Sequence, residues 1–153
     1  MSASYRGNLL SERQALEVAR AAKRVAVLGI KTADKSSQAS YYVPEYLQSQ
    51  GVEVVPVPVY YPEVKEILGE RVYRTVSEVP SSSSLCIVDV FRRPKDLHQH
   101  LEDLLQAKPK CVWLQSGISD RDFEEELAKN GIKVVSSRCL LMDHQRAVRQ
   151  SSL

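Results

Sequence analysis

Glycine is scarce in this sequence, which has 6 among 153 residues, and none of them forms the G-x-G-x-x-G pattern of a dinucleotide-binding turn. Three further motifs are missing: the Walker P-loop, H-E-x-x-H and G-x-S-x-G. These absences argue against a P-loop nucleotidase, a zincin-type metalloprotease and an α/β-hydrolase.

Cysteine, net charge and long apolar runs are also limited. Three cysteines without a C-x-x-C pair predict no disulfide framework and fit a reducing compartment, so we expect a cytoplasmic protein. The net charge of +2 and the interspersed acids argue against nucleic-acid binding. No apolar run approaches the roughly 18 residues of a membrane span. His98 and His100 are two apart and do not share a helical face, so no metal site is predicted.

The remaining sequence alternates short apolar runs with segments of helical spacing. This alternation predicts an α/β protein with a Rossmann-like three-layer fold, in which helices flank a mostly parallel sheet. We expect one domain over residues 1–153, with an N-terminal helix at about 11–23, a core at about 24–144 and a short C-terminal tail. The expected strands are 25–28, 52–57, 85–90, 111–114 and 132–135. In such a sheet, ligands bind at the carboxyl ends of the strands.

The first strand ends at Gly29 and is followed by small, polar and cationic residues. One interpretation is an ordinary loop. The other is a phosphate site, in which backbone N–H groups at a helix N-terminus act together with Lys31 or Lys35. Ser40 would then add a hydroxyl donor near the start of that helix.

The second strand ends in Val55-Pro56-Val57-Pro58, without the acid that a nicotinamide site places there for the ribose hydroxyls. An NAD site is therefore disfavoured. The prolines predict a rigid, extended wall that suits a flat ring or a sugar.

Two arginines follow the strand that ends in Val88-Asp89-Val90. Phe91-Arg92-Arg93-Pro94 stands just before a helix, where cations oppose the helix dipole unless an anion is bound. We favour an anion site, with Arg92 or Arg93 making a forked contact, over merely solvated charge. Asp89 is expected to do no more than pair with one of them.

Two further strand ends supply candidates. After Trp113-Leu114, Gln115 would direct an amide into the cleft and Gly117 would permit a turn with positive φ. An ordinary turn explains these residues equally well. Cys139 follows Arg138 at the last strand end, where a nearby cation can make a thiol nucleophilic. The alternative is a small buried hydrophobe. His144 is expected to be solvated in the tail.

The order of the segments carries a resemblance. VAVLGIK, YLQSQGVEVVPV, ILGERVY, VDVFRRP, VWLQSGI and VVSSRCLLMDH, spread over Arg24 to His144, together resemble the small, single-domain CoA-binding protein family. Its fold is similar to the CoA-binding domain of the succinyl-CoA synthetase alpha subunit. The resemblance implies coenzyme A or an acyl-CoA as the ligand. It implies that Gly29-Ile30-Lys31 and Ser40 take phosphate, and that Val57-Pro58 and Arg92-Arg93-Pro94 line the nucleotide.

The resemblance also bears on catalysis. The synthetase's phosphorylated His belongs to a further domain that this chain lacks, so the resemblance implies binding without ligation, and enzymatic activity stays open. The sequence departs from the family at Lys31, where Ser or Thr is usual, at Val57-Pro58-Val59, where V-N-P is frequent, and at Ser137, where Asp is usual. Two alternatives follow: a thiol-redox protein that forms a mixed disulfide at Cys139, or an interaction domain that has lost its ligand. A homodimer is compatible with either.

Overall fold

A computed structural model describes residues 2–151 of the chain. Its strands are β1 (Arg24–Leu28), β2 (Glu53–Val57), β3 (Glu66–Ile67), β4 (Glu70–Arg71), β5 (Ile87–Val90), β6 (Cys111–Leu114) and β7 (Lys133–Val135). The α-helices are α1 (Glu12–Ala21), α2 (Ala39–Ser49), α3 (Leu101–Ala107), α4 (Arg121–Lys129) and α5 (Leu140–Ser151). Short 3-10 turns are η1 (Ser2–Asn8), η2 (Ala33–Lys35), η3 (Ser82–Ser84), η4 (Pro94–Asp96) and η5 (His98–His100).

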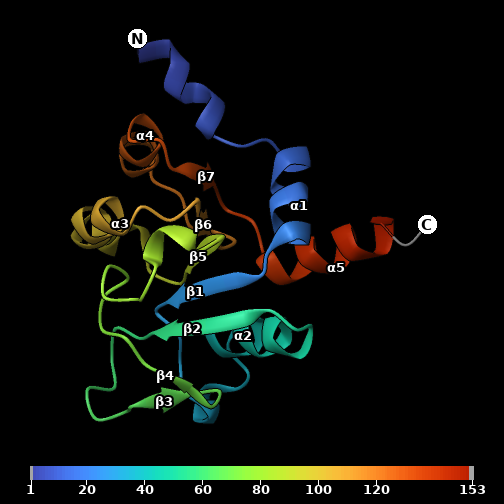
Figure 1. The fold of residues 1–153 in the computed structure, drawn as a ribbon, viewed down its shortest axis with the longest axis vertical. Helices are drawn as coiled ribbons and strands as arrows, with labels where there is room; N and C mark the ends of the chain where they lie inside the picture. The colour runs from blue at the N-terminus through green and yellow to red at the C-terminus, as the bar shows by residue number, and fades with distance from the viewer. Residues whose placement is uncertain (1, 152–153) are drawn as a thin grey trace.

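The main sheet has five strands in the order β2-β1-β5-β6-β7, and all of its pairings are parallel. The small β3–β4 hairpin is antiparallel and forms a second sheet, with β4 next to β2 (Figure 1). The last four residues of β1 and all of β5 and β6 are buried, as expected of strands that are covered on both faces. The expected fold class is confirmed.

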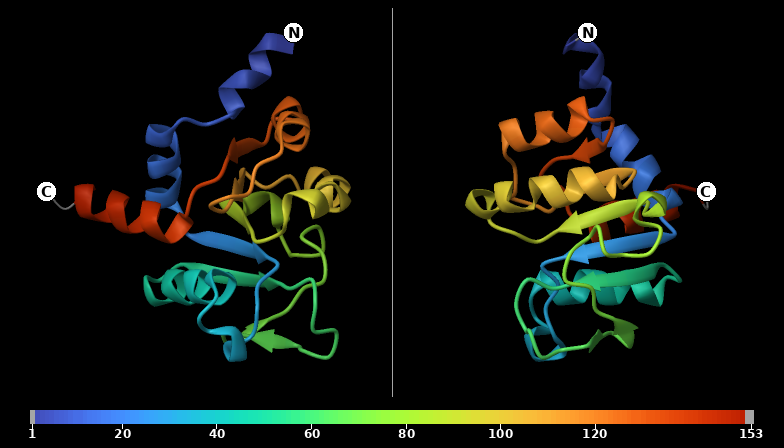
Figure 2. Two further views of the ribbon diagram at one scale, coloured as in Figure 1. Left: turned by 180° about the vertical axis from the view of Figure 1, so that it is seen from behind. Right: turned by 60° about the vertical axis from the view of Figure 1, so that its left-hand side comes forward.

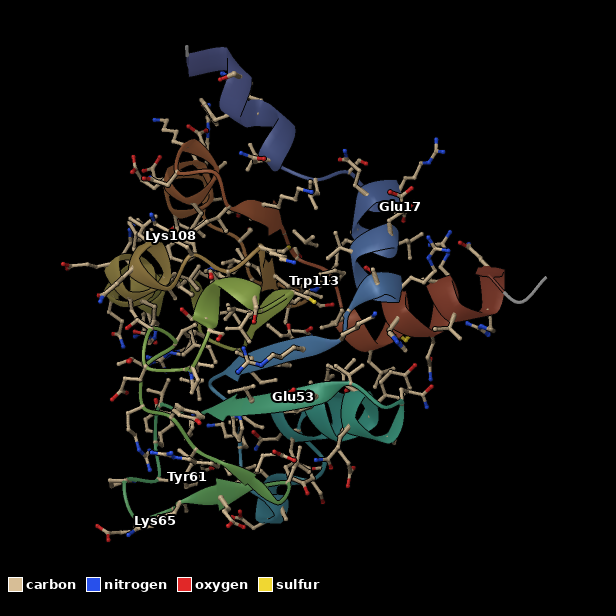
Figure 3. All side chains as sticks on the ribbon, viewed as in Figure 1. Glu17, Glu53, Tyr61, Lys65, Lys108 and Trp113 are labelled. Carbon is tan, nitrogen blue, oxygen red and sulfur yellow. The ribbon has the colours of Figure 1, made fainter. Side chains whose placement is uncertain are left out.

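Helices cover both faces of the sheet, which gives three layers (Figures 1 and 2). One apolar cluster unites Ala26, Val88 and Val112 of the sheet with side chains of α3 and α4. The other unites Val27 and Trp113 with side chains of α1, α2 and α5, and Trp113 lies inside the molecule (Figure 3). Alternate residues of each strand thus face opposite helical layers.

The predicted N-terminal helix is present and begins with a complete capping box. Ser11 Oγ accepts a hydrogen bond from the Gln14 backbone N–H, and Gln14 Oε1 accepts one from the Ser11 N–H. The helix buries Ala15 and Ala19 against the sheet. Before it, Leu10 N donates to the Val134 carbonyl at 2.9 Å, so the N-terminal segment lies along the edge strand β7.

The segment expected as a short C-terminal tail belongs largely to helix α5. His144 is buried on this helix instead of solvated, and its Nδ1 lies 2.7 Å from the Tyr46 hydroxyl of α2. Leu140 packs into the core at the start of the helix, while the C-terminal half extends away from the sheet (Figure 1). None of the helices within residues 2–151 combines the length and the apolar composition needed to cross a lipid bilayer.

Candidate functional site

The order of the strands places a crevice above the carboxyl ends of β1 and β5. From β1 the chain moves to β2 on one side, and it later returns to β5 on the other side of β1. The loops after β1 and β5 therefore diverge in opposite directions, which is the point at which parallel sheets bind ligands. Gly29 follows β1 and Phe91 follows β5, so the two segments predicted from sequence meet here.

Gly29 permits these two loops to approach each other. Its φ is +89°, and a Cβ at this position would lie 2.4 Å from the Phe91 carbonyl oxygen. Its own N–H donates to the Val57 carbonyl at 2.9 Å, which ties the loop to the end of β2. The single glycine of this turn is thus required by close backbone packing.

The N-terminus of α2 opens toward this crevice. Gln38 occupies the N-cap position without a side-chain hydrogen bond to the helix. Ser40 is nearly buried in the first turn and lines the groove described below. The exposed N–H groups and the dipole at a helix N-terminus favour an anion.

Pro44 shapes this helix start in an unexpected way. It lies inside α2, beyond the first turn of the helix. Because proline has no N–H, it cannot donate to the carbonyl of Ser40, four residues earlier. That carbonyl instead accepts a hydrogen bond from the Lys31 backbone N–H at 3.1 Å. Pro44 thereby leaves an acceptor that holds the cationic loop against the helix.

Lys31 and Arg92 converge on a tyrosine that sequence reasoning missed. Lys31 Nζ lies 4.8 Å from the centroid of the Tyr60 ring, and Arg92 Cζ lies 5.9 Å from it. Tyr60 as a residue is 53% exposed. Hydrogen bonding to Arg92 and the charges of Arg92, Arg93 and Lys31 lower the pKa of Tyr60. The only signal in the sequence was its place within the segment that follows β2.

Hydrogen bonds from Arg74 fix the backbone of the loop that carries Tyr60. The Arg74 guanidinium donates hydrogen bonds to four backbone carbonyls of the loop, those of Tyr60, Tyr61, Pro62 and Val64, at 2.7–3.3 Å. Tyr61, labelled in Figure 3, has a positive φ of 64°. These contacts fix the backbone from which Tyr60 reaches the two cations.

The paired arginines differ in exposure. The Arg92 side chain is 9% exposed, whereas that of Arg93 is 66% exposed. Arg93 Nε lies 2.9 Å and Arg92 Nη2 lies 3.9 Å from the same oxygen of Asp96. One carboxylate therefore serves two guanidinium groups, and the cluster keeps a net positive charge.

These elements enclose an open groove of about 390 Å³. Its lining residues are Gln38, Ala39, Ser40, Phe91, Arg92, Arg93, Pro94 and Ile118. The structure thus brings together five of the predicted site residues, Ser40 and Phe91 to Pro94, with Gly29 and Lys31 adjacent through the contacts above. A groove with a helix N-terminus and cations at its edge can hold a phosphorylated ligand.

Other predicted residues lie outside the lining of this groove. Ile30, Val57 and Pro58 are buried, and Lys35 is exposed in η2. Gln115 is buried, and its Oε1 accepts a hydrogen bond from the Leu140 backbone N–H at 3.0 Å. Gly117 has the expected positive φ, and its N–H donates to Ser137 Oγ at 2.9 Å.

Asp89 corrects a further expectation. The predicted pairing with an arginine is wrong, because Asp89 is fully buried within β5 and both of its carboxyl oxygens lack a hydrogen-bond partner. Burial raises the pKa of this carboxyl well above its usual range. Asp89 faces the same layer as Trp113, its neighbour in the β5–β6 register.

Cys139 lies beside an arginine that is already occupied. Arg138 donates to both carboxyl oxygens of Asp143, at 2.6 and 2.9 Å, and to Glu12 at 3.2 Å. The Cys139 side chain is partly buried against the cluster that contains Leu140. The neighbouring charge that motivated the redox alternative is thus directed to two carboxylates.

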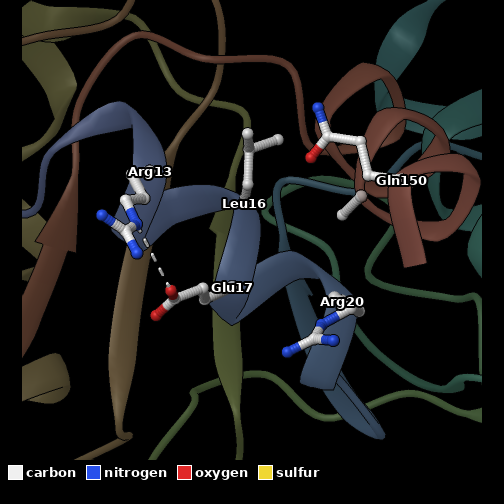
Figure 4. A pocket seen from close by; sticks show the side chains of 6 residues that line it. Arg13, Leu16, Glu17, Arg20 and Gln150 are labelled. Atoms are coloured by element: carbon white, nitrogen blue, oxygen red, sulfur yellow. Dashed lines mark ion pairs between the residues drawn. The ribbon is translucent and has the colours of Figure 1, made fainter. Parts of the chain in front are cut away.

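A separate hollow of about 280 Å³ lies between α1 and α5 (Figure 4). Its lining contains none of the predicted site residues, and Arg13 Nε and Glu17 Oε1 are 3.9 Å apart at its rim. Among residues 2–151, no group of three or more His, Cys, Asp or Glu side chains is arranged to hold a metal ion.

Comparisons with known proteins match nearly the whole chain. The uncharacterized protein YneT of Bacillus subtilis (strain 168) is 28% identical over 134 residues, which cover 88% of this chain and 94% of YneT. A Thermus thermophilus protein, cell-free ID.343, is 36% identical with a TM-score of 0.78, covering 90% of this chain and 99% of that one. A hypothetical protein from Pyrococcus horikoshii OT3 is 25% identical with a TM-score of 0.77, covering 93% and 95%.

The family comparison agrees with the resemblance drawn from the six sequence segments. The family described as "CoA binding domain" matches residues 23–145, a range that contains β1 to β7 and the whole groove. The chain therefore belongs to the CoA binding domain family.

Proposed function

We propose that this protein binds coenzyme A or an acyl-CoA in the groove at the ends of β1 and β5, without a reaction of its own. The observation that carries the proposal is the meeting of the α2 N-terminus with Lys31 and Arg92 at one edge of the sheet. Membership of the CoA binding domain family supports the choice of ligand.

The charges in the groove suit this ligand. Coenzyme A carries a diphosphate and a 3′-phosphate, and each is a strong acceptor for backbone N–H groups and guanidinium. The largely covered Arg92 and the exposed Arg93 share one counter-charge, so an anion gains from their excess positive charge. Tyr60 offers an exposed ring beside the cations for a flat portion of the ligand.

The predicted contact residues fall into two groups under this proposal. Gly29, Lys31, Ser40 and Phe91 to Pro94 surround the ligand, and Lys35 adds charge from η2. Ile30, Val57 and Pro58 are buried and act through the packing of the strand ends, and Gln115 holds the start of α5.

Arg92→Ala tests the proposal by calorimetric titration. We expect the wild-type protein to bind CoA with a dissociation constant in the micromolar range, roughly −8 kcal/mol. The variant should bind about 10- to 100-fold more weakly, because it loses charged hydrogen bonds worth about 1–3 kcal/mol. Added salt should weaken wild-type binding through screening.

Arg121→Ala provides the matched control, because Arg121 is an exposed arginine on α4 that pairs with Glu125 and lies outside the groove. It should bind CoA like the wild type. NAD and AMP serve as ligand controls. A wild-type protein that binds CoA no better than these two would refute the proposal, and unchanged CoA affinity in Arg92→Ala would remove Arg92 from the site.

A further inference from the structure

His100 is held against the arginine of the proposed site. It is the last residue of η5, and its Nε2 lies 3.1 Å from Arg92 Nε. A guanidinium donates hydrogen bonds and accepts none, so Nε2 of His100 must be the acceptor. The contact therefore requires a neutral imidazole with its proton on Nδ1.

The groups around His100 favour this neutral form. The Gln99 side-chain nitrogen lies 3.4 Å from the same Nε2, where an amide donor again needs an acceptor. Burial, followed by the charge of Arg92, lowers the pKa of His100, and Asp103 and Asp96 oppose this effect. Asp103 is engaged by the backbone N–H groups of Val76 and Ser77. His100 is thus neutral at physiological pH.

The contact restricts the orientation of Arg92. Its Nε faces His100, and its Nη2 lies 3.9 Å from Asp96. Its Cδ packs beside Gly29, 3.5 Å from the place where a Cβ on residue 29 would stand. With Nε engaged by His100, the terminal Nη groups, which lie near Asp96 and Tyr60, are the donors that an anion would meet. A side chain that is oriented before binding loses less conformational freedom when the ligand arrives.

We propose that His100 is a positioning residue that, in its neutral form, orients Arg92 for the phosphates of CoA and releases it on protonation. The inference rests on the proposed function. Protonation removes the acceptor at Nε2 and places two like charges side by side.

Two substitutions separate the positioning role from a general loss of packing. His100→Gln can place its Oε1 near the position of Nε2 and thus keeps an acceptor that does not titrate, whereas His100→Leu removes the acceptor. His98→Gln is the matched control, because His98 is exposed on the same turn and contacts Asp120 instead of Arg92. Circular dichroism establishes that each variant is folded.

At about pH 7.5, CoA titrations should give wild-type affinity for His98→Gln and near wild-type affinity for His100→Gln. His100→Leu should bind about tenfold more weakly, because Arg92 loses a hydrogen-bonding partner. Wild-type affinity in a folded His100→Leu variant would overturn the positioning role.

The pH profile supplies the second readout. Between about pH 7.5 and 5, the wild type should lose affinity several-fold relative to His100→Gln, since only the wild type has an imidazole beside Arg92. Asp96 and Tyr60 also lie beside Arg92, but they are common to both proteins. Titration of the CoA phosphates is common to both proteins and cancels in this ratio. A ratio that stays constant with pH would refute release by protonation.

Nitrogen-15 spectra of the imidazole test the inference without any ligand. We expect the Nδ1-protonated tautomer for His100, and the Nε2-protonated tautomer would overturn the contact itself. A wild-type protein that fails to bind CoA would refute the proposed function, and the role of His100 toward CoA with it. If the wild type binds CoA and the His100→Leu variant binds it equally well, only the role of His100 is refuted and the proposed function stands.

Discussion

Gly29 shows at the scale of one residue how the site depends on backbone packing. Of the six glycines, all within residues 2–151, only Gly29 would bring a Cβ within 4 Å of a neighbouring atom in the described structure. That neighbour is the Phe91 carbonyl, which is backbone and cannot move aside like a flexible side chain. The loops that carry Lys31 and Arg92 therefore keep their spacing only if position 29 lacks a side chain.

Gly29→Ala should destabilise the protein by about 3 kcal/mol or more, because a positive φ and a backbone clash act together. Gly131→Ala is the control, because Gly131 has a similar φ of +82° but open space around it. The Gly131→Ala variant should lose about 1–2 kcal/mol of unfolding free energy. Urea denaturation of both variants measures the difference. Equal losses would mean that the Phe91 contact contributes nothing.

At the scale of an element, α5 is held by polar contacts that link it to three other parts of the chain. Gln115 accepts from the first N–H of the helix, Arg138 pairs with Asp143, and His144 contacts Tyr46 on α2. Asp143 is 4% exposed, and its two hydrogen bonds from Arg138 measure 2.6 and 2.9 Å. A carboxylate in this position is stabilised mainly by its partner.

Asp143→Asn should lower the free energy of unfolding by about 1–3 kcal/mol, because it leaves Arg138 without its main counter-charge. Arg13→Ala breaks an exposed pair on α1, whose side chains are 91% and 62% exposed, and should change stability by less than about 0.5 kcal/mol. Chemical denaturation compares the two. If Asp143→Asn were as mild as Arg13→Ala, the ion pair would not be what secures the start of α5.

At the scale of the whole molecule, Asp89 ties global stability to pH. Its pKa is near 3.8 in the unfolded chain and well above that in the folded protein, because burial disfavours the charged form. Between these two values, folding takes up a proton. The contribution of Asp89 to the free energy of unfolding is therefore greatest below pH 3.8. It falls as the pH rises toward the pKa of Asp89 in the folded protein.

Asp89→Asn should remove this dependence with little change in shape. The unfolding free energy of the variant relative to the wild type should rise with pH above about 4, by up to about 1.4 kcal/mol per pH unit. Burial lowers the pKa of both His100 and His144, so these two residues reduce the free energy of unfolding below pH 6.5. Both histidines are present in the variant and in the wild type, so their effects cancel in the difference between the two proteins. Urea unfolding at several pH values measures the difference. A constant offset would indicate that Asp89 does not change protonation on folding.

The sequence by itself determined the alternation of strands and helices, the capping box at Ser11 and the glycine that ends β1. These features depend on neighbours a few residues away, through side-chain periodicity, helix capping and backbone φ. The sequence also indicated that Arg92 and the first turn belong to one site, because the carboxyl ends of parallel strands share an edge. It did not separate the buried Gln115 from residues that line the groove.

Only the tertiary structure decided which partners those residues meet. Arg92 reaches Tyr60 because β2 and β5 flank β1 in the sheet, so that the segments that follow them meet. Lys31 N–H binds the Ser40 carbonyl that Pro44 leaves free. Helix α5 was missed because its hold on the molecule comes from distant residues, such as Tyr46, which lies 98 positions from His144. Contacts of this kind depend on how the layers pack, and local sequence patterns do not encode them.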